Sequence, residues 1–134
     1  MSSEAETFPV RSGEDVVKAR QIVRSRAMHL GFSLVEQTKI VTAASELARN
    51  AVIYGGGGEM RVERVHQSGR RAGLRLTFED HGPGIADIDL ALRDGFTTGN
   101  GLGLGLNGAR KLSHEFDIQS KPGQGTRVTI TRWK

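Results

Sequence analysis

The sequence predicts an α+β fold, a two-layer sandwich in which helices cover one face of a mainly antiparallel mixed sheet. Two amphipathic helical segments come first, and a strand hairpin, a long loop, a short helix and a second hairpin follow. A doubly wound parallel sheet would need strands and helices in regular alternation, which this order lacks. The helices are therefore expected to gather on one side of the sheet.

The first half of the chain predicts an edge strand at residues 8–10 and then two helices. Ser12 is the expected N-cap of the first helix, because two acidic residues follow it where the helix dipole favours negative charge. Gly31 ends this helix, and Ser33-Leu34-Val35-Glu36 is a capping box that opens the second, which runs to the glycines at 55–58. Apolar residues recur at helical spacing in both. They are Val16, Ala19, Val23, Ala27 and Leu30, then Val41, Ala44, Leu47, Ala48 and Ala51.

The second half predicts two hairpins separated by a loop and a short helix. The stretch at 82–105 shows little apolar periodicity, and a loop of that length in a compact domain usually serves a function. The other expected elements are strands at 60–66 and 74–80, a helix at 106–112, and strands marked by Phe116 with Ile118 and by Val128 with Ile130.

Composition predicts one soluble domain spanning residues 1–134, with a flexible tail at about 1–7. The absence of cysteine excludes disulfides, thiolate metal ligands and a cysteine nucleophile, and it fits a reducing, cytoplasmic location. The N-terminal residues lack the apolar segment of a signal peptide or membrane anchor, so no membrane association is expected.

The net charge of +4 raises the question of nucleic acid, since several arginines lie close together between residues 61 and 75. Only 5% of the residues are aromatic, and no stacking side chains lie between these arginines. Nucleic acid is therefore not an expected partner. A basic surface would also suit an acidic protein or a nucleoside triphosphate.

Asp80 ends a strand whose apolar residues, up to Phe78, alternate with polar ones, so its carboxylate shares the buried face. A buried carboxylate needs a partner, and no cation lies beside it in the sequence. The exocyclic amine of a ligand would satisfy it, and Gly82 and Gly84 would let the backbone approach that ligand. The alternative is an aspartate that simply opens a Gly-Pro-Gly turn.

Glu46 and Asn50 are four residues apart in the second helix, with Thr42 one turn earlier, so their side chains share one face. Such oxygen-bearing groups can serve a hydrated Mg²⁺ ion and a proton-accepting task together. The alternative is a solvated helix face in which Arg49 pairs with Glu46.

The segment Gly99-Asn100-Gly101-Leu102-Gly103-Leu104-Gly105-Leu106 places alternating glycines before the third helix. Backbone N–H groups at a helix N-terminus bind phosphate, and the sequence lacks the Gly-Lys-Ser/Thr ending of a P-loop. A flexible surface loop is the alternative.

Thr126 shares a face with Val128 and Ile130, so its hydroxyl could reach the same base as Asp80, or it could simply fill a strand position.

These three motifs, E-x-x-x-N on a helix, D-x-G-x-G after a strand and G-x-G-x-G before a helix, resemble in this order the GHKL or Bergerat ATP-binding fold. That fold is shared by gyrase, heat-shock chaperones, histidine kinases and MutL. The local sequences Ser45-Glu46-Leu47-Ala48-Arg49-Asn50, Glu79-Asp80-His81-Gly82-Pro83-Gly84-Ile85, Asp94-Gly95-Phe96-Thr97-Thr98 and Glu115-Phe116-Asp117-Ile118 are similar to the small anti-sigma-factor serine kinases, and within them to the stressosome switch-kinase type.

The resemblance implies an ATP-dependent serine/threonine kinase that phosphorylates a STAS-domain protein. After its release, such a kinase binds and activates a metal-dependent (PPM-type) serine phosphatase. Two alternatives remain, an anti-sigma factor that binds a sigma factor as a nucleotide-regulated module, and a free ATPase.

The resemblance also implies the roles of individual residues. Glu46 would accept the proton of the attacking hydroxyl, Asn50 would hold Mg²⁺, and Asp80 would accept from the adenine amino group. The remaining implied ATP-binding residues are Gly82, Gly84, Ile85, Gly99, Gly101, Leu102, Gly103, Leu104, Gly105 and Thr126.

Overall fold

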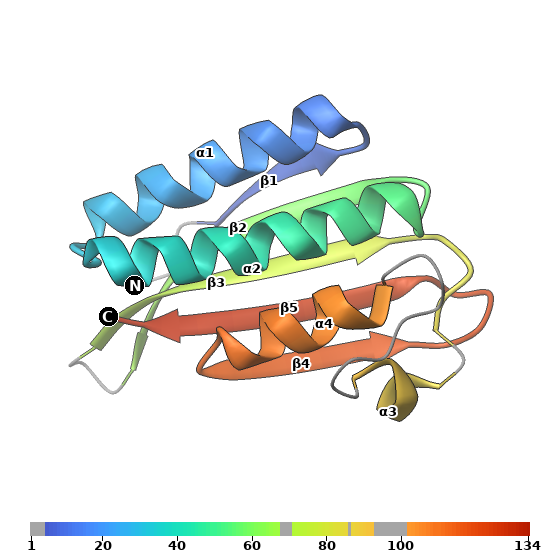
Figure 1. Ribbon diagram of the computed structural model, residues 1–134. Coiled ribbons are helices and arrows are strands. Elements are labelled where there is room, and N and C mark those ends of the chain that lie inside the picture. The colour runs from blue at the N-terminus through green and yellow to red at the C-terminus, as the bar shows by residue number, and fades with distance from the viewer. Residues whose placement is uncertain (1–4, 68–70, 86, 93–101) are drawn as a thin grey trace.

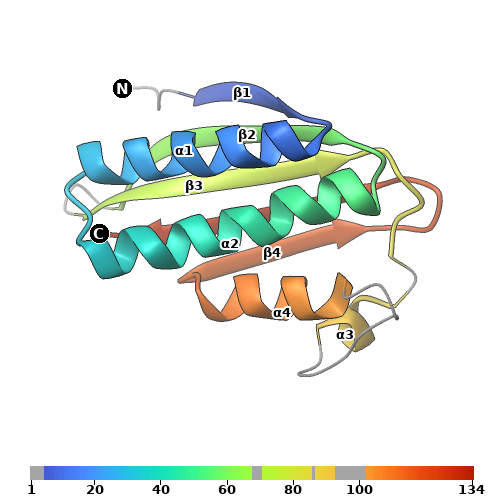
Figure 2. The same ribbon diagram turned by 45° about the horizontal axis from the view of Figure 1, so that its top comes forward.

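The computed structural model describes residues 5–67, 71–85, 87–92 and 102–134. Its sheet has five strands in the order β1-β2-β3-β5-β4, and three helices longer than one turn lie on one face of it (Figures 1 and 2). The strands are β1 (Ala5–Val10), β2 (Gly58–Gln67), β3 (Arg71–Asp80), β4 (Glu115–Ser120) and β5 (Thr126–Trp133). The helices are α1 (Gly13–His29), α2 (Leu34–Ile53), the single turn α3 (Ile88–Ala91) and α4 (Leu102–Lys111).

The predicted α+β architecture is confirmed, with one difference in the sheet. All pairings between the described strands are antiparallel, so the sheet is not mixed in this part of the chain. The first strand is also longer than expected. It begins at Ala5 and pairs with β2 along its whole length, so residues 5–7 belong to the sheet and not to a tail.

The two long helices start where the sequence predicts. The Ser12 side chain accepts the backbone N–H of Asp15 at 3.3 Å. The capping box of α2 is complete, since Ser33 Oγ accepts the Glu36 N–H and Glu36 Oε1 accepts the Ser33 N–H, both at 3.2 Å. Gly31 follows α1 with a φ of +86°, a conformation that glycine adopts without strain.

The predicted apolar faces of the helices pack against the sheet. Val16, Ala19, Val23 and Ala27 of α1 are all buried. The core also contains the predicted inward residues of the strands, among them Leu74, Leu76, Phe78, Val128 and Ile130. Among the described residues, no helix combines the length and apolarity needed to cross a bilayer.

The region after β3 differs most from the sequence prediction. The single turn α3 lies inside the expected loop, and α4 begins at Leu102 instead of Leu106. Gly103 and Gly105 therefore lie within the helix, where a loop was expected. The packing of α4 explains its extent, because Gly105, Leu106, Asn107 and Ala109 are buried in or against the core.

A small apolar cluster lies on the other face of the sheet. Val65, Gly73 and Trp133 are neighbours in register across β2, β3 and β5, and Val65 and Trp133 are both buried. Trp133 is fixed by two hydrogen bonds of 2.8 Å, from its ring Nε1 to Glu115 Oε2 and from its backbone N to His114 Nδ1. The indole ring of Trp133 covers Gly73, and a side chain at residue 73 would displace this ring.

We expect Gly73→Ala to destabilise the fold through this ring. A Cβ at residue 73 would lie 2.6 Å from Trp133 Cε3 and 3.0 Å from the Arg132 carbonyl oxygen. Overpacking of this kind costs about 1–3 kcal/mol of unfolding free energy. Denaturant unfolding, followed by the fluorescence of the sole tryptophan, measures the loss. Gly13→Ala is the matched control, because a Cβ there meets nothing within 4 Å. Equal midpoints for the two variants would contradict the prediction.

Candidate nucleotide site

A cavity of about 260 Å³ lies between the C-terminal half of α2 and the adjoining ends of β3 and β5. Asp80 and Thr126 are register partners and form its sheet side, while Asn50 lines it from the helix. Gly84 and Ile85 contribute from the loop after β3. The cavity thus brings together five residues that the sequence analysis selected from three distant segments.

Asp80 is half-buried at this cavity, and no lysine or arginine among the described residues pairs with it. Its Oδ1 accepts the backbone N–H of Gly82 at 2.9 Å. Burial raises the pKa of the carboxyl, and this effect outweighs the backbone hydrogen bonds of Gly82 and Thr126 and the charge of His81, which lower it. Neighbouring Glu79 raises it further. A hydrogen-bond donor brought by a ligand would therefore stabilise this carboxylate.

Glycines surround Asp80 because three backbone segments approach it closely. A Cβ at Gly55 would lie 2.6 Å from Asp80 Oδ2, and one at Gly82 would lie 2.6 Å from the Gly55 Cα. Gly125 has a φ of +80°, and a Cβ there would meet the Asp80 carbonyl. Gly84 has a φ of +77° and faces Lys121 in the same way. In this structure the glycines let the backbone close on itself around the carboxylate.

Ser120 links the loop after β3 to the sheet beside Thr126. Its Oγ accepts the Ile85 N–H at 2.7 Å and lies 3.0 Å from the Gly125 carbonyl oxygen. The hydroxyls of Ser120 and Thr126 are 2.8 Å apart. Thr126 therefore lines the cavity with its hydroxyl already held by a neighbour.

The helix side of the site places Glu46 and Asn50 against α4. A Cβ at Gly105 would lie 3.0 Å from Asn50 Nδ2 and 3.2 Å from Glu46 Oε2. Glu46 also pairs with Arg49 at 3.4 Å, and its side chain is 38% exposed. Glu46 therefore lies beside the cavity at the surface, and not in its lining.

Asn50 is the residue that could serve a metal-bound phosphate. Its Nδ2 is buried and has no hydrogen-bond partner in the described part of the chain. A side-chain amide can present either its nitrogen to a phosphate or its oxygen to Mg²⁺, so the orphaned group fits both tasks. Among the described residues, no cluster of three or more histidine, cysteine, aspartate or glutamate side chains is arranged to hold a metal.

The glycine-rich segment is only partly described. Gly99 and Gly101 lie outside the described residues. The backbone of Leu102, Gly103 and Leu104 forms the first turn of α4. Gly105 lies against Asn50 and Glu46, and Leu106 lines the cavity.

The sequence analysis does not select several residues of this region. Ser120 lies beside the cavity, bonded to Thr126 and Ile85, and the alternation of its strand predicts that it shares the inward face with Phe116 and Ile118. Gly55 was noticed only as part of a helix end. The other lining residues that sequence analysis did not assign to the site are Leu47, Ala51, Tyr54, Phe78, Pro83, Leu106 and Val128.

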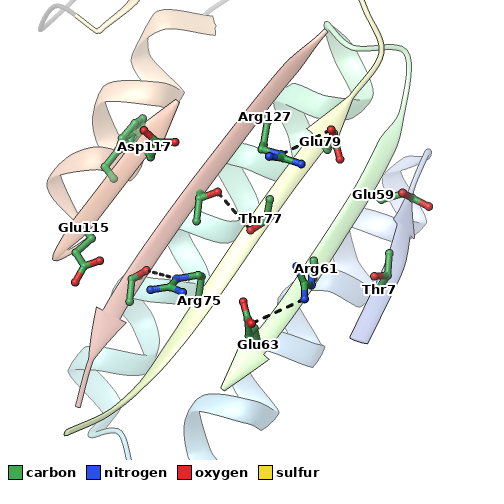
Figure 3. A pocket seen from close by; sticks show the side chains of 13 residues that line it. Thr7, Glu59, Arg61, Glu63, Arg75, Thr77, Glu79, Glu115, Asp117 and Arg127 are labelled. Atoms are coloured by element: carbon green, nitrogen blue, oxygen red, sulfur yellow. Dashed lines mark hydrogen bonds and ion pairs between the residues drawn. The ribbon is translucent and has the colours of Figure 1, made fainter. Parts of the chain in front are cut away.

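A larger hollow of about 690 Å³ lies on the open face of the sheet (Figure 3). Four of its charged side chains pair with one another, Arg127 with Glu79 at 3.7 Å and Arg61 with Glu63 at 3.9 Å. Arg75 Nε donates to Thr131 Oγ1 at 3.1 Å. It contains none of the predicted site residues, so the smaller cavity is the candidate site.

The fold and this cavity define an ATPase domain of the GHKL class. The chain belongs to the family of histidine kinase-, DNA gyrase B- and HSP90-like ATPases, whose model matches residues 23–134.

Within that family, the chain is 46% identical over 119 residues to the serine/threonine-protein kinase RsbT of Bacillus subtilis, covering 89% of each chain. It is 32% identical over 120 residues to the anti-sigma F factor of Thermoanaerobacter sp., covering 86% of this chain and 82% of that one. The structure of full-length ShkA in complex with AMPPNP matches with a TM-score of 0.55 at 20% identity. That match covers 98% of this chain and 32% of ShkA, and it shows the fold.

Gly55→Ala is expected to weaken nucleotide binding, because the added Cβ would push against the Asp80 carboxylate. Calorimetric titration with ATP measures the effect, which we expect to be at least about tenfold in Kd. Gly108→Ala in α4 is the control, since a Cβ there meets nothing within 4 Å. Unchanged affinity in Gly55→Ala would show that the carboxylate position does not matter for binding.

Asp80→Asn is expected to stabilise the ligand-free protein at neutral pH. Folding raises the pKa of the wild-type carboxyl above its ordinary value of 3.8. The carboxyl therefore stabilises the fold at pH values below 3.8, and this stabilisation is lost as the pH rises through the pKa of the folded state. The side chain of Asp80→Asn does not ionise, so the variant does not lose this stability at neutral pH, and its amide oxygen can still accept the Gly82 N–H. Thermal unfolding between pH 4 and 7.5 tests the prediction, with Asp117→Asn on the open face as the control. A lower Tm for Asp80→Asn than for wild type at pH 7.5 would contradict it.

Proposed function

We propose that the chain is an ATP-dependent protein serine/threonine kinase of a partner-switching pathway. Its protein substrate is a STAS-domain protein, and after release the kinase binds and activates a metal-dependent (PPM-type) serine phosphatase. The proposal is supported by the similarity to the kinase RsbT over 89% of the chain and by the arrangement of the cavity.

The observation that carries the proposal is a pair of polar side chains at the cavity, each with hydrogen-bonding capacity left for a ligand. Asp80 offers a carboxylate without a basic partner, and Asn50 offers a buried amide without any partner among the described residues. The lining between them is largely apolar, with Phe78, Ile85 and Val128 among its members. Such a lining suits a flat heterocycle, with an exocyclic amine at one end and phosphates at the other.

At the base end, Asp80 accepts a hydrogen bond from the adenine amino group, and Thr126 supports the base directly or through water. Gly82 and Gly84 shape the wall beside it. The pairing selects for ATP over GTP, because guanine has a carbonyl oxygen at the position of the adenine amine. That oxygen would face the carboxylate with no proton to share.

At the phosphate end, Asn50 and the glycine segment hold the triphosphate. Gly99, Gly101, Leu102, Gly103, Leu104 and Gly105 are the residues of that segment whose backbone N–H groups would serve phosphate oxygens. Mg²⁺, when bound through Asn50, would neutralise charge on the phosphates.

Glu46 serves the protein substrate at this end of the site. The attacking serine or threonine oxygen forms a bond to the γ-phosphorus as the bond to the bridging oxygen of ADP breaks. The hydroxyl proton passes to a carboxylate oxygen of Glu46. The exposed fraction of 38% leaves this carboxylate accessible to a macromolecular substrate.

An anti-sigma factor that binds a sigma factor directly is the second candidate function. The 32% identity to the anti-sigma F factor of Thermoanaerobacter sp. favours it. In that case nucleotide would control the conformation of a binding module. Recovery of a sigma factor, and of neither a STAS-domain protein nor a phosphatase, by the purified chain would favour this candidate.

Transfer of labelled phosphate from Mg-ATP to the STAS-domain protein of the same organism tests the kinase. We expect Asn50→Asp to reduce transfer at least about 100-fold, because a carboxylate replaces the amide beside the phosphates. Glu46→Gln should lower kcat with little change in the KM for ATP, because it removes the proton acceptor.

Gln67→Glu at the end of β2 adds the same charge as Asn50→Asp far from the cavity, so it serves as the control. Full transfer by Asn50→Asp would remove the assignment of this residue to the phosphates. Absence of transfer by wild type with ATP bound would favour the anti-sigma candidate.

A further inference from the structure

In the described part of the chain, the exposed large apolar side chains gather on two neighbouring helices. All five belong to α1 and α2, and they are 51–76% exposed: Val17, Met28, Leu34, Val35 and Ile53. Single exposed apolar residues need no explanation, but a shared location does.

Four of these five residues lie on two rows along the outer side of the helices, and Leu34, the first residue of α2, lies outside both rows. Residues three or four apart share one face of a helix. The row on α1 is Val17, Gln21, Arg24 and Met28, with Arg20 beside it, and all are exposed. The row on α2 is Val35, Thr38, Thr42, Glu46, Arg49 and Ile53. We call these rows together the outer helical face.

The antiparallel pairing of the helices orders this face. Because α1 and α2 lie side by side and are joined at residues 30–33, the start of α1 lies beside the end of α2 (Figure 2). Val17 and Ile53 therefore mark one end of the face, and Met28 and Val35 mark the other. Met28 lies eleven positions after Val17 in the helix, a span of about 16 Å.

The charged groups between these ends are mainly basic. Arg20, Arg24 and Lys39 are exposed, and no ion pair of theirs is found among the described residues. Three acidic groups on the same helices are engaged: Asp15 accepts the Arg11 N–H, Glu36 completes the capping box and Glu46 pairs with Arg49. Exposed Glu14 lies at the start of α1, before Val17. The face therefore offers positive charge between two apolar ends.

We propose that the outer helical face docks an acidic amphipathic helix of a partner protein. Two antiparallel helices packed side by side offer a surface on which a third helix can lie, and that helix would need about 12–15 residues to reach both apolar ends. Carboxylates at its centre would complement Arg20 and Arg24, and apolar residues near its ends would cover the exposed side chains. The charge of the face selects this occupant over a second copy of this chain, whose same face is also basic.

The face also reaches the reacting end of the candidate site. Glu46 belongs to the α2 row, one turn from Thr42 and in contact with Arg49. A helix docked here would hold its protein beside the proposed proton acceptor. The inference thus rests on the proposed function, because it describes how the kinase holds its protein partner.

A binding experiment without ATP tests the docking. The probe is a fluorescent, helical 18-residue peptide with leucines 11 residues apart and glutamates between them, and fluorescence anisotropy measures its affinity. We expect saturable binding by wild type that weakens with salt, and binding at least about tenfold weaker to Arg20→Glu/Arg24→Glu. Val17→Ser/Met28→Ser should also weaken it, with little change in salt dependence.

Arg61→Glu/Arg127→Glu is the matched control, because it makes the same charge change on the open face of the sheet. Its affinity for the peptide should equal that of wild type. Circular dichroism and ATP titration of every variant verify the fold and the nucleotide site. The proposal is overturned if Arg20→Glu/Arg24→Glu and the control variant lose the same amount of affinity for the peptide, or if wild type does not bind the peptide.

The kinase reaction gives an independent reading. With the STAS-domain protein as substrate, Arg20→Glu/Arg24→Glu should raise the KM for that protein about tenfold and leave the KM for ATP unchanged. Peptide binding without phosphate transfer would support the docking face and count against the proposed function. Phosphate transfer by the double variant with an unchanged KM for the STAS-domain protein would support the proposed function and count against the docking face. If purified wild type is a dimer and Arg20→Glu/Arg24→Glu is a monomer, a second copy of the chain occupies this face and the proposal is overturned.

Discussion

A half-buried carboxylate without a basic partner is the constraint around which this fold is arranged. Asp80 is the last residue of β3, and the backbone after α2, the loop after β3 and the start of β5 all close upon it. Each approach is possible only where a side chain is missing, as at Gly55 and Gly125. The cost of holding the charge there is a loss of stability in the ligand-free protein, which a bound donor would recover.

The site divides its tasks between the two layers. The sheet supplies Asp80 and Thr126, which are fixed by register and by the Ser120 hydroxyl. The helix layer supplies Asn50 and Glu46, which depend on how α4 packs against α2. Under the proposed function, base recognition would therefore rest on hydrogen-bonded strands, whereas phosphate chemistry would rest on helix packing. Substitutions in the two layers should affect different stages of the reaction.

Much of this architecture could be read from local patterns. The caps of α1 and α2 and the alternation in β3 follow from short-range rules, and the structure has them where expected. Gly82 and Gly84 also follow from the local motif, but the approach of Gly55 and Gly125 to Asp80 depends on segments far away in sequence. The sequence predicts a later start for α4, because glycines disfavour helix, and the burial of Gly105 against Asn50 and of the residues after it explains the longer helix. The burial of Trp133 on the open face depends on partners from β2 and β3 that lie far away in sequence, so no local pattern could reveal it.

The outermost strands limit how such a domain can associate. At one edge, β1 contains Pro9, which has no N–H to offer an incoming strand. At the other edge, β4 carries Glu115 and Asp117 on alternate positions, and acidic side chains along an edge oppose pairing with another strand. Extension of the sheet from molecule to molecule, the usual route to aggregation, is disfavoured at both sides. A protein of this shape must meet its partners through its faces, where side chains and not backbone decide which partner is accepted.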